Sequence, residues 1–176
     1  MSILKVARLG HPVLRTRARP LEENQIKSQA IQKLVDDMIE TMHEYQGIGL
    51  AAPQIYEGFR IFVAGIESES EDGELSTTVF INPEVVSLDS SKNEDWEGCL
   101  SIPDMCGRVL RPANVRIRSL DRQGESFEKE LRGHSARVVQ HELDHLDGIL
   151  FLDRMISFES LSFLEEFERF WRSEAN

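Results

Sequence analysis

The chain has 176 residues, 40% of them apolar, which is enough for one domain with a proper core, so we expect a single domain over residues 1–176. Its net charge of −11 argues against broad binding to nucleic acid or anionic lipid, and no stretch has the length of a membrane span. The first twenty residues lack the apolar stretch of a secretory signal, and two cysteines are too few for a disulfide framework, so we expect a cytoplasmic protein.

The first predicted element is an amphipathic helix from Ser28 to Tyr45. Its apolar residues recur at the spacing of one helix face and are Ile31, Leu34, Val35, Met38, Ile39 and Met42. The helix must stop near Gly47 and Gly49. Residues 47–54 are then a run of small residues that ends in one amide side chain. Such a run lets the backbone approach a ligand, but a tight loop explains it equally well.

The middle of the chain predicts strands. Short β-branched and aromatic runs bounded by turn residues predict strands at residues 60–65 and 77–82. The acidic, serine-rich residues 67–76 between them are most simply a solvated loop. Alternating residues at 115–120, a turn, and an extended run at 126–131 predict an antiparallel hairpin.

Two further helices complete the prediction. One runs from Ser135 to Asp147 and ends at Gly148. The other runs from Ser157 to Arg172, and its expected core positions are Leu161, Leu164, Phe167 and Trp171. Strands cluster between helices without β-α-β alternation. The predicted fold class is therefore α+β, with mostly antiparallel strands packed around a central helix and with flanking N-terminal and C-terminal helices.

The predicted central helix contains the sequence His141-Glu142-Leu143-Asp144-His145. Histidines four residues apart lie on one helix face, so their imidazoles can bind one metal ion. The intervening glutamate can act as a base toward a metal-bound water. Ordinary amphipathic helices also contain this pattern, so the metal site depends on a third ligand.

Three sources of a third ligand can be compared. A longer version of the H-E-x-x-H pattern adds a glycine and a third ligand histidine. Gly148 matches that glycine, but Phe151 stands where the histidine would be, so this source fails. Glu165 or Glu166 would give a metallopeptidase-type site, but these residues lie in a glutamate-rich helix where solvent exposure is the better explanation. Cys99 is the remaining candidate, although a small buried hydrophobe is the commonest role of a lone cysteine.

Three ordered segments make the chain resemble the peptide deformylases. The motifs of that family are G-x-G-hydrophobic-A-A-x-Q, E-G-C-x-S and H-E-x-D-H, and they match residues 47–54, 97–101 and 141–145. The similarity covers roughly residues 3–156 and is weakest in the C-terminal helix. It implies a hydrolase that removes the formyl group from the N-terminal N-formylmethionine of newly synthesised polypeptides and releases formate. The resemblance implies nascent chains at the ribosome as partners. We expect no sequence-specific contact with nucleic acid, and the oligomeric state stays open.

The resemblance also implies a cofactor. Cys99, His141 and His145 would hold one divalent metal ion, with Fe(II) as the common native ion of the family and Zn(II) or Ni(II) forms also known. A thiolate and two imidazoles are a suitable ligand set for such borderline ions.

The other site residues follow from the same motifs. Glu142 is implied to take a proton from water and to deliver one to the departing amine. The Gln54 side-chain amide and the Leu100 backbone N–H are implied to stabilise the oxyanion. The backbone at Gly49 would pair with the extended substrate. Ile48 and Val138 are implied to form an apolar pocket for the methionine side chain.

Two positions invite alternative interpretations. Asp144 would orient a ligand histidine or cap nearby backbone, and an exposed helix acid is an equally good explanation. Cys106 stands where many family members have an arginine that shapes the substrate rim, which puts the preferred peptide length in doubt. Arg108 or Arg111 could substitute for that arginine, and Cys106 itself is an alternative metal ligand that we disfavour.

An alternative function from another class is a deformylase-like fold that only binds formylated or other N-terminal peptides. It is disfavoured because Gln54, Glu142 and all three implied metal ligands are present.

Overall fold

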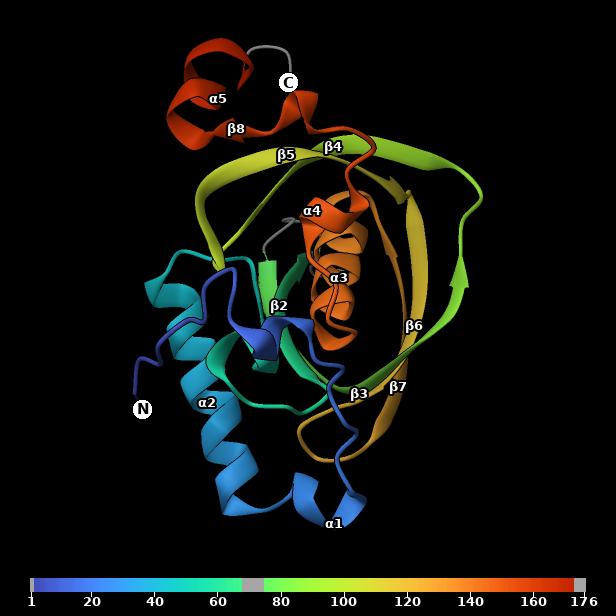
Figure 1. Ribbon diagram of the computed structural model, residues 1–176. Helices are drawn as coiled ribbons and strands as arrows, with labels where there is room; N and C mark the ends of the chain where they lie inside the picture. Colours follow the sequence, from blue (N-terminus) through green and yellow to red (C-terminus); the bar gives the residue numbers. More distant parts are fainter. Residues whose placement is uncertain (1, 68–74, 173–176) are drawn as a thin grey trace.

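Two antiparallel sheets surround a central helix, α3 (Gly133–Leu146), in a computed structural model that describes residues 2–67 and 75–172 (Figure 1). The larger sheet has five strands in the order β1-β2-β3-β6-β7, and the smaller has three in the order β4-β5-β8. Every pairing between these strands is antiparallel. The predicted α+β class is confirmed, with the helix that contains both motif histidines at its centre.

The strands of the larger sheet are β1 (Gly49–Ala51), β2 (Ile61–Glu67), β3 (Leu75–Leu88), β6 (Asn114–Leu120) and β7 (Ser126–Arg132). Those of the smaller sheet are β4 (Lys92–Cys99), β5 (Ile102–Pro112) and β8 (Ser162–Phe163). The β4–β5 hairpin is inserted in the chain between β3 and β6. It passes above α4 and α3 in the view of Figure 1. This insertion brings the end of β4 to the central helix.

The helices flank this arrangement. The long α2 (Gln29–Glu44) begins where the Ser28 side chain accepts a hydrogen bond from the Ile31 N–H, which satisfies an otherwise free helical donor. The shorter α-helices are α1 (Glu23–Ile26), α4 (Phe151–Arg154) and α5 (Leu164–Phe170). Three short 3₁₀ helices are η1 (Pro12–Arg15), η2 (Ala52–Ile55) and η3 (Phe158–Ser160). Within the described residues, no helix combines the length and apolar character needed to cross a bilayer.

The β2 strand is buried on both faces because it lies between two helices. Ile61 and Val63 pack in the cluster formed with α2, whereas Phe62 and Ala64 pack in the cluster formed with α3. Alternate residues of a strand point to opposite faces, so both sets must be apolar. Burial on both faces explains why the apolar residues of β2 do not alternate with polar ones.

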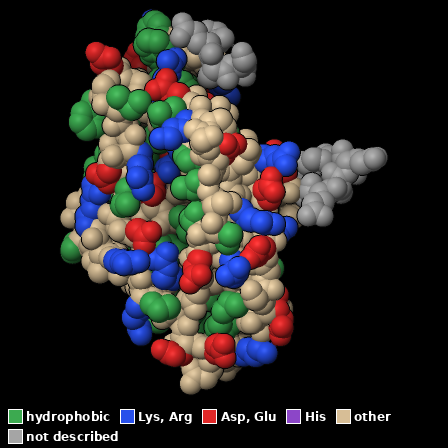
Figure 2. Space-filling view, turned by 90° about the vertical axis from the view of Figure 1, so that its right-hand side faces the viewer, with side chains coloured by type: hydrophobic (Ala, Val, Ile, Leu, Met, Phe, Trp, Pro, Cys, Tyr) green, Lys and Arg blue, Asp and Glu red, His purple; other side chains and the backbone are tan. Residues whose placement is uncertain are grey.

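The outer face of the larger sheet is charged. Figure 2 shows the side on which β6 and β7 lie in Figure 1, and basic and acidic side chains are interspersed there. Arg118 of β6 donates hydrogen bonds to Glu128 of β7, its direct partner across the strand pair. The charged side chains of the predicted hairpin therefore face solvent, and its apolar side chains face α3.

The prediction of one C-terminal helix from Ser157 to Arg172 was wrong. The structure divides this segment into η3, the two-residue strand β8 and α5. The break occurs because Ser162 and Phe163 pair with Cys106 and Met105 of β5, and a residue in a strand pair cannot also continue a helix. Of the expected core positions, Leu164 and Trp171 are exposed, and Leu161 and Phe167 are only partly buried.

Other differences concern strands with weak sequence signals. Residues 49–51 form β1 rather than a loop, and residues 92–95 of β4 are all exposed, so their sequence lacks apolar alternation. The predicted loop is shorter at both ends, because Glu67 belongs to β2 and Leu75 and Ser76 to β3. Its remaining residues, 68–74, lie outside the described part of the chain.

Candidate metal centre and active site

Three side chains that can bind a metal ion meet where β4 ends against α3. Cys99 is the last residue of β4, and His141 and His145 lie one turn apart on α3. One ligand atom from each lies within 4.8 Å of the other two, and Cys99 Sγ is 3.2 Å from His145 Nε2. A shift in the β4–β5 register between Gly98 and Cys99 ends the regular pairing just before the sulfur. Within the part of the chain that the structure describes, this is the one such group of three or more His, Cys, Asp or Glu residues.

The electrostatics of the cluster fit a cation. Burial opposes ionisation of the Cys99 thiol, but the neighbouring His145 and His141 rings outweigh it and hold the thiol pKa well below its usual range. The thiolate is the form that binds metals. His145 Nδ1 is buried and has no hydrogen-bond partner among the described residues. An anionic sulfur and two imidazoles held this close together suit Fe(II), Zn(II) or Ni(II), so the residues present fit a metal ion.

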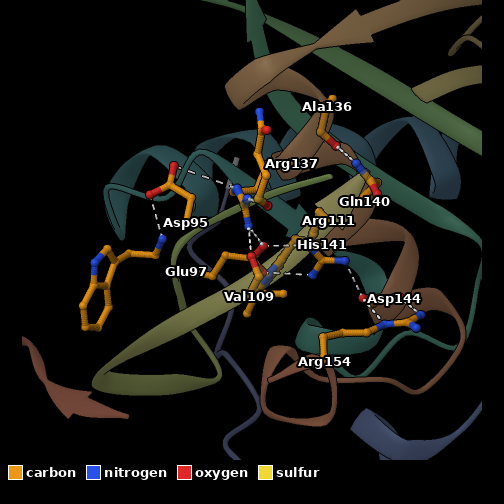
Figure 3. Close-up of polar contacts among 12 residues, drawn as sticks. Asp95, Glu97, Val109, Arg111, Ala136, Arg137, Gln140, His141, Asp144 and Arg154 are labelled. Atoms are coloured by element: carbon orange, nitrogen blue, oxygen red, sulfur yellow. Dashed lines mark hydrogen bonds and ion pairs between the residues drawn. The ribbon is translucent and has the colours of Figure 1, made fainter. Parts of the chain in front are cut away.

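Glu97 orients His141 from the far side of the ring. His141 Nδ1 lies 2.9 Å from Glu97 Oε2, while Arg111 donates to both carboxylate oxygens at 2.6 and 2.9 Å and Arg137 donates to Oε1 at 2.8 Å (Figure 3). Burial raises the pKa of Glu97, but the hydrogen bonds from His141 and Arg111 hold it well below the usual range. A carboxylate that accepts from Nδ1–H fixes the tautomer and leaves the Nε2 lone pair for a metal.

Asp144 belongs to the same buried network. Arg111 Nη1 donates to Asp144 Oδ2 at 2.8 Å, and Arg154 of α4 donates to Asp144 Oδ1 at 2.6 Å (Figure 3). The expectation that Asp144 orients a ligand histidine was wrong, because its hydrogen-bond partners are arginines, and the exposed alternative was wrong because Asp144 is buried. Arg111 is also buried in this network, so it cannot serve as a rim arginine.

The roles of Glu97, Arg111 and Arg137 were missed from the sequence. The only available signal was that Glu97 opens the E-G-C-x-S motif beside Cys99. The two arginines lie far from it in sequence, and the β4–β5 register and the position of α3 bring them together.

Glu142 lies on α3 with its carboxylate against the backbone of Gly49. A Cβ atom on Gly49 would lie 2.2 Å from Glu142 Oε1, so any side chain here would displace the carboxylate. Burial raises the pKa of Glu142 to about 7, against the opposing effect of His141 and His145. Its Oε2 atom is buried without a hydrogen-bond partner in the described chain. This carboxyl can therefore accept or give a proton near neutral pH.

Gln54 is held so that its amide nitrogen points at the cluster. Its Oε1 accepts a hydrogen bond from the Ala51 N–H at 2.8 Å, which fixes the orientation of the amide. The Nε2 atom then lies 3.2 Å from Ser101 Oγ and 3.6 Å from Cys99 Sγ. Leu100 directly follows Cys99, so its backbone N–H lies in the same turn after β4.

These groups open into one cleft of about 1050 Å³. Every predicted site residue except His145 lines it: Ile48, Gly49, Gln54, Cys99, Leu100, Val138, His141 and Glu142. His145 is only 1% exposed, and its Nε2 atom contacts Cys99 Sγ. Glu165 and Glu166, the alternative ligands, are exposed on α5 and do not belong to the cysteine–histidine group. Cys106 does not belong to that group either, and burial raises the pKa of its thiol.

Comparison with known proteins gives a consistent result. The family model described as Polypeptide deformylase matches residues 3–160. A peptide deformylase of Salinibacter ruber is 45% identical over 163 residues, which cover 89% of this chain and 82% of that protein. A peptide deformylase of Pseudomonas aeruginosa is 39% identical over 175 residues, which cover 99% of this chain and 100% of that protein.

Solved structures agree with this result. The Met-Ala-Ser-bound class I type b peptide deformylase of Acinetobacter baumannii aligns with a TM-score of 0.82 at 38% identity, over 88% of this chain and 99% of that one. The peptide deformylase of Thermotoga maritima aligns with a TM-score of 0.81 at 36% identity, over 89% of this chain and 100% of that one.

Proposed function

This chain belongs to the peptide deformylase family, an enzyme family that removes the N-formyl group from nascent peptides, and from that premise we propose how its own residues carry out the reaction. The observation that carries the proposal is the convergence of Cys99, His141 and His145 beside the buried carboxyl of Glu142. We assign these residues, with Gln54 and Leu100, to one catalytic domain formed by residues 1–176.

Cys99, His141 and His145 hold one divalent metal ion, and Fe(II) is our proposed resident ion, with Zn(II) or Ni(II) as functional substitutes. When bound, the ion supplies Lewis acidity that makes an attacking water more acidic and polarises the formyl oxygen. Glu97 keeps His141 in the tautomer that such an ion requires, and Arg111 and Arg137 keep Glu97 ionised.

Glu142 moves the protons of the reaction. Its carboxylate accepts a proton from the attacking water while the water oxygen bonds to the formyl carbon. The same carboxyl then gives that proton to the amide nitrogen as the carbon–nitrogen bond breaks. Formate and a peptide with a free amino terminus are released. A pKa of about 7 suits both steps, because the group is then a competent base and a competent acid.

Gln54 and Leu100 stabilise the negative charge that develops on the formyl oxygen. The hydrogen bond from the Ala51 N–H to Gln54 Oε1 already turns the Nε2 end of the amide toward the cluster. The Leu100 backbone N–H is the second donor. Loss of one such donor raises a barrier by about 3 kcal/mol.

The substrate binds as an extended chain along β1. This strand is at the edge of the larger sheet and pairs on one side only, with β2, so the backbone at Gly49 is available to a peptide. Ile48, an exposed apolar residue, and Val138 contact the methionine side chain. The peptide in the related Acinetobacter baumannii structure, Met-Ala-Ser, supports an occupant of this kind. We place the reaction in the cytoplasm, on nascent chains at the ribosome, where formylated termini are produced.

The central test is anaerobic formate release from formyl-Met-Ala-Ser. The metal-loaded wild type should release formate. Glu142→Ala should keep its metal, but its kcat should fall by a factor of about 10² to 10⁴. Cys99→Ser should lose bound metal, whereas the matched variant Cys106→Ser should keep it. Cleavage of internal peptide bonds, or metal loss confined to Cys106→Ser, would contradict the assignment.

A further inference from the structure

The two proposed oxyanion donors come from different sheets. Gln54 lies on η2, which directly follows β1 of the larger sheet, whereas Leu100 lies in the turn between β4 and β5 of the smaller sheet. The described strands of the two sheets do not pair with one another. Sheet hydrogen bonding therefore does not set the spacing between the Gln54 side-chain amide and the Leu100 N–H, and other contacts must set it.

Residues 5–9, which we call the N-terminal strap, join these two places. The Ala7 N–H donates to the Gln54 carbonyl at 2.6 Å, and the Leu9 N–H donates to the Ser101 carbonyl at 2.8 Å. Carbonyls in the last turn of a helix lack partners within it, and Gln54 is in that position on η2. In Figure 1 the strap belongs to the dark blue segment that passes from the side of α2 to the bend between β4 and β5.

A direct contact links the same two residues. Gln54 Nε2 donates to Ser101 Oγ at 3.2 Å, and both residues are buried. The strap thus holds the two backbones, and this hydrogen bond connects the two side chains. A shift of either backbone would move the Gln54 amide relative to the N–H of Leu100, which directly precedes Ser101.

The strap itself is held by α2 and by the core. Just before the strap, the Leu4 N–H donates to Thr41 Oγ1 of α2 at 2.9 Å. Within the strap, Ala7 is fully buried and packs in the same core cluster as Ile102 of β5. The residues on either side of Ala7 line the catalytic cleft. A segment bonded and packed in this way can act as a fixed spacer between η2 and the β4–β5 turn.

We propose that the N-terminal strap is a positioning element for the oxyanion donors, and that the Ala7 and Leu9 N–H groups set the distance between the Gln54 amide and the Leu100 N–H. In this role the strap acts through those two donors and not on the reacting atoms. Donors lower the barrier only when they are aligned before the charge develops. This inference rests on the proposed function and adds residues outside the three motifs to it.

Replacement of one amide by an ester tests the strap, because an ester lacks the N–H and keeps the side chain. In the ester analogue Ala7→lactate, we expect kcat for formyl-Met-Ala-Ser to fall about tenfold, with KM and metal content unchanged. Ala113→lactate is the matched control, since the Ala113 N–H donates to the Ser91 carbonyl at 2.9 Å and Ala113 does not line the cleft. Both esters lose one backbone hydrogen bond, so both should lower Tm, but only Ala7→lactate should lower kcat.

Combination with Gln54→Ala shows whether the strap acts through the oxyanion donors. In that background we expect Ala7→lactate to reduce kcat only about twofold, because a donor that is absent cannot be misplaced. A general structural effect would reduce kcat by the same factor in both backgrounds, and that result would overturn the proposal.

The other outcomes are equally distinct. An unchanged kcat in Ala7→lactate overturns the proposal, and so does an equal loss of kcat in Ala113→lactate. If Ala7→lactate does not fold, the ester at Leu9 gives the same test with the same expected loss, because it removes the bond to Ser101 at a residue that is 48% exposed. Loss of metal together with kcat would assign the strap to folding of the whole site. Absence of formate from the metal-loaded wild type contradicts the proposed function instead.

Discussion

At the scale of single residues, Gly49 and Glu142 depend on each other. The glycine leaves room for the carboxylate, and the carboxylate occupies the space that any side chain at position 49 would need. In the proposed mechanism the Glu142 oxygen takes a proton from the attacking water, so even a small displacement of this carboxylate should reduce kcat.

Gly49→Ala tests this dependence. The new Cβ would lie 2.2 Å from Glu142 Oε1, so the carboxyl must move, and we expect kcat for formyl-Met-Ala-Ser to fall about 100-fold with metal content unchanged. Gly58→Ala is the control, because a Cβ there meets nothing within 4 Å. Equal kcat values for the two variants would show that Glu142 tolerates the displacement.

Glu97 is the second residue whose effect can be isolated. Glu97→Gln removes the charge that two arginines and His141 share, so the Nδ1–H of His141 is left with a neutral amide as its partner in place of a carboxylate. We expect metal affinity to fall about 10- to 100-fold, measured by competition with a chelator. Glu94→Gln, on the same strand but exposed, should keep wild-type affinity.

The candidate site was predictable from the sequence because all of its predicted residues except Val138 lie in three short motifs. The structure brings eight of the nine predicted residues to one cleft and leaves their chemical roles as proposals. The supporting charges were not predictable. Only the fold brings Arg111 and Asp144 into contact. An isolated arginine or aspartate in a sequence gives no indication of a buried partner.

At the scale of elements, α2 secures the N-terminal segment. Asp37 of α2 accepts a hydrogen bond from the Ser2 N–H at 2.9 Å and pairs with Lys33, and Thr41 Oγ1 accepts from the Leu4 N–H. The hydrogen bond from Lys33, followed by that from Ser2, lowers the pKa of Asp37 against the effect of burial.

This depressed pKa gives a pH dependence of stability with a definite sign. The contribution of Asp37 should be present above its unfolded pKa of about 4 and should disappear as pH falls through the lower folded value. The difference in free energy of unfolding between wild type and Asp37→Asn should therefore be positive at pH 7 and shrink below pH ~4. Urea denaturation at several pH values measures it.

Glu44→Gln, exposed near the end of the same helix, provides the reference for the Asp37 experiment. A difference for Asp37→Asn that stayed constant down to pH ~2 would mean that packing, not charge, stabilises this contact.

Elements with a strong periodic signal were predicted well, and those fixed by distant partners were not. The helix predicted at residues 28–45 is α2, and the predicted hairpin is β6–β7, because apolar periodicity and turn residues are local properties. The β4 strand is polar along its first half, and β8 exists only because β5 pairs with it. Such strands depend on tertiary context, which overrides local propensity.

At the scale of the whole molecule, the proposed metal ion joins the two sheets. Cys99 belongs to the smaller sheet, and α3 packs on the larger one, so an ion held between them should stabilise the assembly of both. The predicted family, fold class and reaction were confirmed, because three ordered motifs across most of the chain are far more specific than any one of them.

Metal removal measures this stabilisation. A ligand that binds only the folded state adds about 4 kcal/mol when its free concentration is 1000 times Kd. We therefore expect Tm to fall on chelation and to recover with anaerobic Fe(II), by calorimetry. Cys106→Ser should recover in the same way and Cys99→Ser should not. An identical Tm with and without metal would mean that the sheets associate independently of the ion.

The order of the ligands along the chain affects how the enzyme itself matures. Cys99 is synthesised 46 positions before His145, and three strands are made in the interval. During that time the thiol has no imidazole beside it, so it keeps the low reactivity of an ordinary cysteine. All three proposed ligands can therefore hold a metal ion together only after the second histidine has emerged and α3 has docked.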